Sequence, residues 1–187
     1  MTEAVLIGGH GGSFPWTAAA PAYAPEAATR APTADVAIVK GETAAADWAL
    51  VTLSAGGTRK VAVQVINDLP HLVVESVFRI DDGRWGTLAS GSSGDASRPG
   101  HIVARAAVDA VVNRWRRGPD SPDGVRGRLR ARAERETWLA ARIASLAATL
   151  DDDEIRAAAD GVQAACRQWA RLPVGGALRL GWPLPFG

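Results

Sequence analysis

Residues 47–90 read DWALVTLSAGGTRKVAVQVINDLPHLVVESVFRIDDGRWGTLAS, and this stretch decides the fold that the sequence predicts. A glycine pair at 56–57 separates two runs of β-branched and apolar residues, which is typical of a hairpin with a two-residue loop. An Asp-Gly pair at 82–83 marks a second such turn. Residues 67–70, Asn-Asp-Leu-Pro, favour a turn between the two hairpins. The stretch therefore predicts a meander of four antiparallel strands.

The two turns also predict which side chains share a face of that meander. Counting outward from the glycine pair places Leu50 opposite Val63 and Thr52 opposite Val61. Counting outward from the second turn places Ile80 opposite Trp85. We expect one buried face to hold Trp48, Leu50, Val63, Val65, Val74, Phe78, Ile80 and Trp85. Such a face needs a cover of other elements.

Helical periodicity follows the turn-rich residues 91–100 and supplies that cover. Apolar residues recur at helical spacing from Ile102 to Trp115, and two further helices are expected at about 122–149 and 152–171. Asp151 and Glu154 have the spacing of a capping box, so this acidic cluster indicates a helix start and not a metal site. The short connection predicts that the second and third helices form an antiparallel hairpin.

The chain of 187 residues, 47% of them apolar, can bury a core without a metal or disulfide. We predict a single α+β domain at 35–187, in which a four-stranded meander at about 47–90 packs against helices at about 100–172. Residues 1–34 form a Gly-rich start and an Ala/Pro-rich arm. Residues 35–40 and 177–180 are possible further strands.

Charge and hydropathy restrict the class of protein. The net charge of +1 argues against general attraction to polyanions. No stretch approaches the roughly 20 apolar residues of a membrane span, and the start of the chain does not have the pattern of a signal peptide. A lone cysteine, Cys166, fits a reducing compartment. We therefore expect a cytoplasmic protein that binds no membrane.

The glycine-rich stretch Gly8-Gly9-His10-Gly11-Gly12 is the most conspicuous motif. It resembles the oxyanion-hole segment of α/β-hydrolase esterases, which implies a small hydrolase with His10 near its active site. That family also has a Gly-x-Ser-x-Gly elbow, and residues 91–94, Gly-Ser-Ser-Gly, depart from its spacing. The alternative interpretation is a tightly turning glycine loop. No complete catalytic set, cofactor motif or metal-ligand set appears, so we predict neither cofactor nor metal.

An arginine-rich segment opens the second predicted helix and suggests nucleic-acid binding as an alternative function. Phosphates could be bound by four arginines, with stacking from a nearby tryptophan. The residues concerned are Arg126, Arg128, Arg130, Arg132 and Trp138. Residues two apart on a helix point about 200° from one another, so the arginines surround the helix instead of forming one basic face. Ion pairs with neighbouring glutamates are the simpler explanation.

The last segment, residues 173–187, is unusually apolar for a terminus. Termini fray unless they are bound, so we expect this tail to dock on the protein's own core or on a neighbouring subunit. The candidate interface residues are Leu178, Leu180, Trp182 and Phe186. With no catalytic set in view, the sequence favours a small interaction or regulatory module that self-associates or binds a protein partner.

Overall fold

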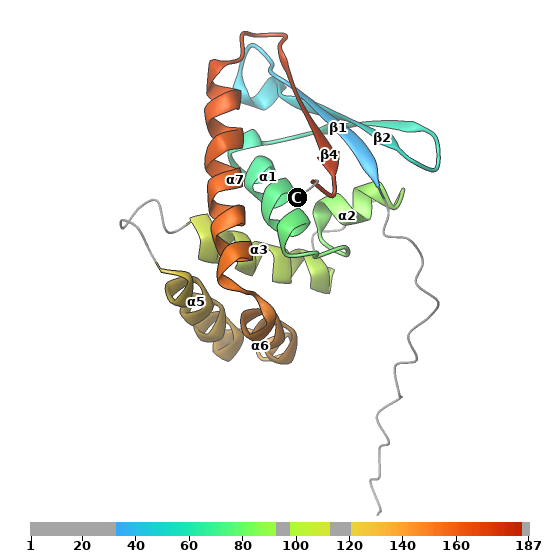
Figure 1. Ribbon diagram of the computed structural model, residues 1–187. Coiled ribbons are helices and arrows are strands. Elements are labelled where there is room, and N and C mark those ends of the chain that lie inside the picture. Colours follow the sequence, from blue (N-terminus) through green and yellow to red (C-terminus); the bar gives the residue numbers. More distant parts are fainter. Residues whose placement is uncertain (1–32, 93–97, 113–120, 185–187) are drawn as a thin grey trace, which may run out of the picture. The chain divides into compact units, whose positions relative to one another are not determined.

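A computed structural model describes residues 33–92, 98–112 and 121–184 (Figure 1). The chain divides into two units, residues 1–30 and 31–187, and all described residues belong to the second unit. Its strands are β1 (Ala34–Val39), β2 (Trp48–Leu53), β3 (Thr58–Ala62) and β4 (Ala177–Trp182). Its helices are α1 (Val65–Val77), α2 (Arg84–Ala89), α3 (Pro99–Val112), α5 (Pro122–Arg135), α6 (Ala140–Thr149) and α7 (Asp152–Arg171), and a single 3-10 turn, η1 (Ala44–Ala46), precedes β2.

The predicted α+β class and the four-stranded antiparallel sheet are confirmed. The strand order is β3-β2-β1-β4, so the first three strands form a meander and the last strand returns from the end of the chain. β4 pairs antiparallel with β1, and Ala34 lies opposite Trp182. The two stretches considered as possible further strands, 35–40 and 177–180, are thus integral to the sheet.

The first hairpin has the predicted turn but a different register. Thr52 lies opposite Thr58 instead of Val61, because the loop spans residues 53–57 and Leu53 N–H donates to the Gly57 carbonyl at 3.0 Å. The observed pairing differs from the predicted pairing by three residues. Because three is an odd number, side chains predicted to point inward on one strand point outward instead. Ala49 and Val51 are buried, whereas Leu50 points outward and is 36% exposed. The prediction that Leu50 lies on the buried face is therefore wrong.

The second hairpin was predicted wrongly, because residues 65–77 and 84–89 are the helices α1 and α2. The apolar residues of α1 also fit a helical period: Leu69, Leu72 and Val73 are almost completely buried on one side. Six of the eight residues predicted to lie on the buried face are buried, although they lie in these helices or next to them. They are Val63, Val65, Val74, Phe78, Ile80 and Trp85. They form a helical layer and not a sheet face, and Trp48 is only half-buried.

The predicted second helix is interrupted at residues 136–139, and its two halves, α5 and α6, pack along one another as a helical hairpin. A hairpin was predicted, but between the second and third helices; instead α7 packs mainly against α1. Gly161 of α7 makes this approach close, since a Cβ there would lie 3.0 Å from Val73 Cγ1. The capping box is confirmed: the Asp151 side chain accepts from Glu154 N–H at 2.7 Å.

Helices cover one face of the sheet, and Figure 1 shows α1, α2 and α7 on that side. Val36, Ile38 and Val51 point into this layer and are at most 2% exposed. Lys40, just after β1, connects the sheet to the end of α7 through a hydrogen bond. Its Nζ donates to the Leu172 carbonyl at 2.8 Å, where a positive charge also complements the helix dipole.

Candidate functional site: the open face of the sheet

The side of the sheet opposite the helices forms a continuous surface, which we call the outer face. Side chains alternate along each strand, so residues between the buried positions point to this side. The outer face comprises Asp35, Ala37, Val39, Trp48, Leu50, Thr52, Thr58, Lys60, Ala62, Ala177, Arg179 and Gly181. None of these residues is buried by the parts of the chain that the structure describes.

The strand registers arrange the outer face in rows that run across all four strands. The first row is Ala177, Val39, Trp48 and Ala62; the second is Arg179, Ala37, Leu50 and Lys60; the third is Gly181, Asp35, Thr52 and Thr58. The first row is entirely apolar. In the second row, two cations bracket two apolar residues, and the third row is polar with one carboxylate. The apolar centre of the face thus has charged residues of both signs around it.

Trp48 and Leu50 carry most of the apolar surface of the outer face. Lys60 Nζ lies 4.3 Å from the centre of the Trp48 ring, a cation–π distance worth about 0.5–1 kcal/mol at an exposed site. This contact holds the Lys60 side chain against the sheet. Leu50, in the neighbouring row, is among the few large hydrophobic residues that the described chain leaves exposed.

A shallow hollow of about 250 Å³ lies at the third-row end of the outer face. Asp35, Thr52 and Gly181 of that row line it, together with Thr33, Leu53, Ser54 and residues 182–183. It offers one carboxylate and several hydroxyl groups, which suit a cationic group better than an anion. The hollow therefore adds a polar recess beside the apolar rows.

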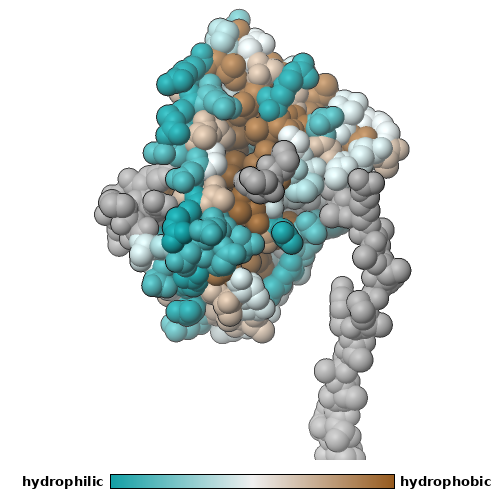
Figure 2. Space-filling view, viewed as in Figure 1, coloured by the Kyte–Doolittle hydropathy of each residue, from teal (hydrophilic) through white to brown (hydrophobic). Residues whose placement is uncertain are grey.

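The tail residues proposed as a partner interface lie mainly in this chain's own fold. Leu178 and Trp182 of β4 point to the helical side and are 7% and 2% exposed, so the tail docks on its own core. Leu180 is half-buried and packs against the same core. In the view of Figure 2, apolar residues form a band between α7 and β4. Phe186 lies outside the described residues.

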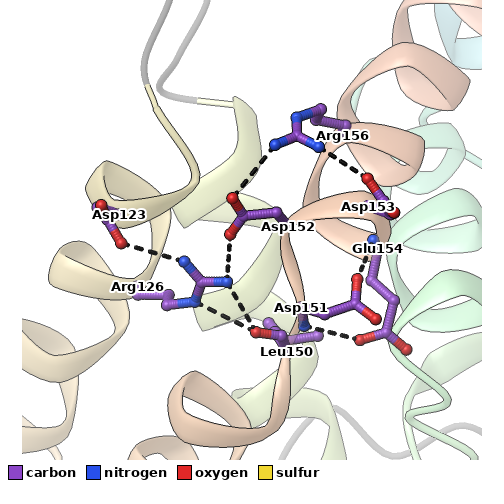
Figure 3. A network of polar contacts seen from close by, with 8 residues as sticks. All are labelled: Asp123, Arg126, Leu150, Asp151, Asp152, Asp153, Glu154 and Arg156. Carbon is purple, nitrogen blue, oxygen red and sulfur yellow. Dashed lines mark hydrogen bonds and ion pairs between the residues drawn. The ribbon is translucent and has the colours of Figure 1, made fainter.

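The arginines of α5 make contacts within the protein, and Figure 3 shows those of Arg126. Arg126 donates to the Leu150 carbonyl at the end of α6, at 3.0 Å, and to the Asp152 carboxylate at 2.6 Å. Arg128 Nε donates to the Ala110 carbonyl of α3 at 2.9 Å. Arg132 pairs with Glu136 at 2.7 Å. These side chains satisfy carbonyls at helix ends and neighbouring carboxylates.

Arg130 and Trp138 remain exposed, Trp138 at 61%, on α5 and on the connection that follows it. Of the residues proposed to contact nucleic acid, these two keep their side chains toward solvent. The structure therefore does not gather the proposed set into one basic surface.

The esterase-like motif, Gly8–Gly12 with His10, lies outside the described residues. Of its suggested elbow, Ser92 is described: its carbonyl accepts from Arg59 Nη1 at 3.2 Å, and its hydroxyl lies 3.3 Å from that of Ser90. No histidine contact with Ser92 is present among the described residues. The geometry there is that of a helix end, since Gly91 has a φ of +79° directly after α2.

Sequence reasoning missed a buried polar cluster between α1 and α2. Glu75 is completely buried, and its carboxylate accepts from Trp85 N–H at 2.8 Å and contacts His71 Nδ1 at 3.0 Å. Asp68, also buried, pairs with Arg84 at 3.0 Å. The spacing 68, 71, 75 on one helix face was a usable signal once residues 65–77 were taken as a helix. Each carboxylate has protein partners, so the cluster joins the two helices.

No group of three or more metal-ligating side chains occurs within the described ranges. Burial raises the pKa of the Cys166 thiol, which keeps it protonated and poorly nucleophilic.

Among the described helices, none has the length and apolar character needed to cross a bilayer. Comparison with protein-family models, with curated proteins and with solved structures found no match to this chain. The outer face is therefore the strongest candidate site that the geometry offers.

Proposed function

We propose that this protein is a cytoplasmic interaction module that self-associates through the outer face of its sheet. The observation that supports the proposal is that the exposed Leu50 and the half-buried Trp48 lie side by side in rows of a sheet face that no described helix covers. Exposed apolar patches bordered by polar residues are typical of protein–protein contact sites. Burying the apolar side chains of the first two rows would supply the driving force.

A second copy of the chain suits this surface because the surface carries both signs of charge. A two-fold interface brings the same patch of each subunit together, so a positive group of one copy can meet a negative group of the other only if the patch carries both signs. Arg179 and Lys60 stand at opposite edges of the second row, and Asp35 stands in the third row beside the hollow. We propose that the two-fold pairing brings a cation of one copy close to Asp35 of the other.

The test is the mass of the native protein in solution, measured by light scattering over a range of concentrations. We expect a native dimer and a monomer for Leu50→Arg, because the new charge would be buried without a partner. Trp138→Arg is the matched control, since it also places arginine at an exposed large apolar residue but lies in the connection between α5 and α6, which pack against other helices. We expect that control to remain a dimer.

Two results would overturn the proposal. One is a native protein that stays monomeric at every concentration tested. The other is a dimer that Leu50→Arg leaves intact, which would place the interface elsewhere. Truncation at Pro173 is not a suitable test, because β4 contributes a sheet strand and the buried Trp182. Thermal unfolding of each variant establishes that it is folded.

Nucleic-acid binding is less well supported, because Arg126, Arg128 and Arg132 are engaged in contacts within the protein. It predicts an affinity for mixed DNA and RNA that falls steeply with salt. We expect no such binding at low salt. A hydrolase function has its only support in the His10 motif, and we expect an ester-hydrolysis screen to give no activity that His10→Ala removes.

A further inference from the structure

The free edge of β3 presents unpaired backbone groups. Val63 N–H donates to the Asp47 carbonyl, and Leu53 N–H donates to the Gly57 carbonyl, so odd-numbered residues of this strand direct their N–H and C=O groups toward β2. The backbone groups of Thr58, Lys60 and Ala62 consequently point away from the sheet. β3 is the end strand in the order β3-β2-β1-β4, so no further strand of the sheet meets them.

One of these outward groups has a protein partner in the described chain. The Ala62 carbonyl accepts from Arg84 Nη2 at 3.2 Å. The part of β3 that can pair with another strand therefore ends at Ala62. The N–H and C=O groups of Thr58 and Lys60, and the Ala62 N–H, make no hydrogen bond within the residues described. Unpaired backbone groups on a sheet edge are a template for another extended chain.

The charged side chains beside this edge indicate which kind of extended chain could bind there. Arg59 and Lys60 lie on opposite faces of β3: the first donates to the Ser92 carbonyl at 3.2 Å, and the second covers the Trp48 ring. The hairpin from residue 48 to residue 63 contains no Asp or Glu. Cations thus flank the edge on both faces. Two copies of β3 placed edge to edge would oppose these like charges, which disfavours a second copy as the added strand.

We infer that β3 accepts an extended, acidic segment of a partner protein as an additional strand. Backbone hydrogen bonds to Thr58, Lys60 and Ala62 hold the segment, and its carboxylates approach Arg59 and Lys60. This site goes beyond self-association through the outer face, since it uses the edge of the sheet and a partner of opposite charge. The two proposals can fail separately, because one is measured by mass and the other by peptide binding.

The test uses a fluorescently labelled synthetic peptide of alternating glutamate and valine, titrated with the full-length protein at low salt and followed by anisotropy. Its lysine counterpart should not bind. An acidic peptide N-methylated along its central residues keeps its charge but lacks the N–H groups that pair with β3. We expect N-methylation to weaken binding at least about tenfold, which corresponds to about 1.4 kcal/mol.

A matched set of protein variants separates backbone pairing from charge. Lys60→Pro removes an outward N–H without removing a hydrogen bond to β2, and should abolish binding. Lys60→Ala keeps that N–H, and should bind more weakly with a smaller dependence on salt. Arg130→Ala removes one exposed positive charge from α5 and should leave the affinity unchanged.

Absence of binding to the acidic peptide at low salt would overturn the inference. So would equal binding of the unmodified and N-methylated peptides, because that result would indicate charge attraction without strand addition. Circular dichroism establishes whether Lys60→Pro folds. If that variant unfolds, the two peptides with the native protein decide the question.

Discussion

The buried carboxylate of Glu75 allows the sharpest test of the fold. It lies on α1, is completely inaccessible to solvent, and accepts from Trp85 N–H at the start of α2 at 2.8 Å. Its other oxygen contacts His71 Nδ1 at 3.0 Å. A Cβ added at Gly83 would lie 2.5 Å from the same carboxylate. One side chain therefore fixes how α2 approaches α1.

Replacing Glu75 with alanine leaves the buried Trp85 N–H without its acceptor and removes one packed methylene together with the carboxylate. An unsatisfied buried donor costs about 1–3 kcal/mol, and the lost side-chain atoms add about 1 kcal/mol for each buried methylene. We expect Glu75→Ala to lower the free energy of unfolding by about 2–4 kcal/mol. Glu75→Gln should cost less, because its amide oxygen can still accept from Trp85 N–H.

Urea unfolding followed by tryptophan fluorescence measures both variants, with the m-value as a check that the transition keeps its two-state form. Gly83→Ala provides the coupled perturbation. Its added methyl group collides with the Glu75 carboxylate, so it should destabilise the native protein but cost clearly less in the Glu75→Ala background. If Glu75→Ala changed stability by less than about 0.5 kcal/mol, the magnitude of a neutral surface substitution, the argument from burial would be refuted.

Three further predictions concern single side chains. Lys40→Met removes the ammonium that donates to the Leu172 carbonyl after α7, and should lower the free energy of unfolding by about 1 kcal/mol in chemical denaturation. The pKa of Asp81 is raised above its ordinary value of 3.8, first by partial burial and then by the charge of Asp82. The ionised form is therefore disfavoured in the folded state, and Asp81→Asn should raise the melting temperature at neutral pH, with a gain that disappears as the pH falls below 3.8; an equal gain at all pH values would contradict this cause. Cys166 should react with iodoacetamide more slowly in the native protein than in urea, because burial raises the pKa of its thiol, and equal rates would contradict that assignment.

The sequence predicted the fold class and the helices that lie between about 100 and 172, and it failed where two periods fit the same residues. In α1 and at its C-cap, Val74 and Phe78 suit strand alternation as well as a helical stripe, and the Asp-Gly pair after them suggested a hairpin turn. The connection that contains Gly83 is instead packed against the Glu75 carboxylate. That contact involves residues eight apart on different elements, so the local pattern could not reveal it.

The register of the first hairpin depended on packing that the turn does not encode. Ala49 and Val51 face the helices, and Trp85 of α2 fills space in that layer with only 1% of its surface exposed. Small inward residues on β2 thus complement a large residue on a helix, whereas the predicted register placed Trp48 and Leu50 inward. Since Gly56 and Gly57 both have φ near +95°, the loop can include more residues than the glycine pair alone.

The arginine-rich segment shows why a charge pattern was a weak guide to the site. Arg126 and Arg128 reach the last carbonyls of α6 and α3, positions that are far from α5 in sequence and carry no formal charge. Helix ends leave several carbonyls without an intrahelical partner, and a guanidinium offers five donors to satisfy them. The ends of neighbouring helices therefore account for two of the arginines of α5, Arg126 and Arg128. On the outer face, the exposed Leu50 and the half-buried Trp48 instead lie in the strand that sequence analysis placed in the core.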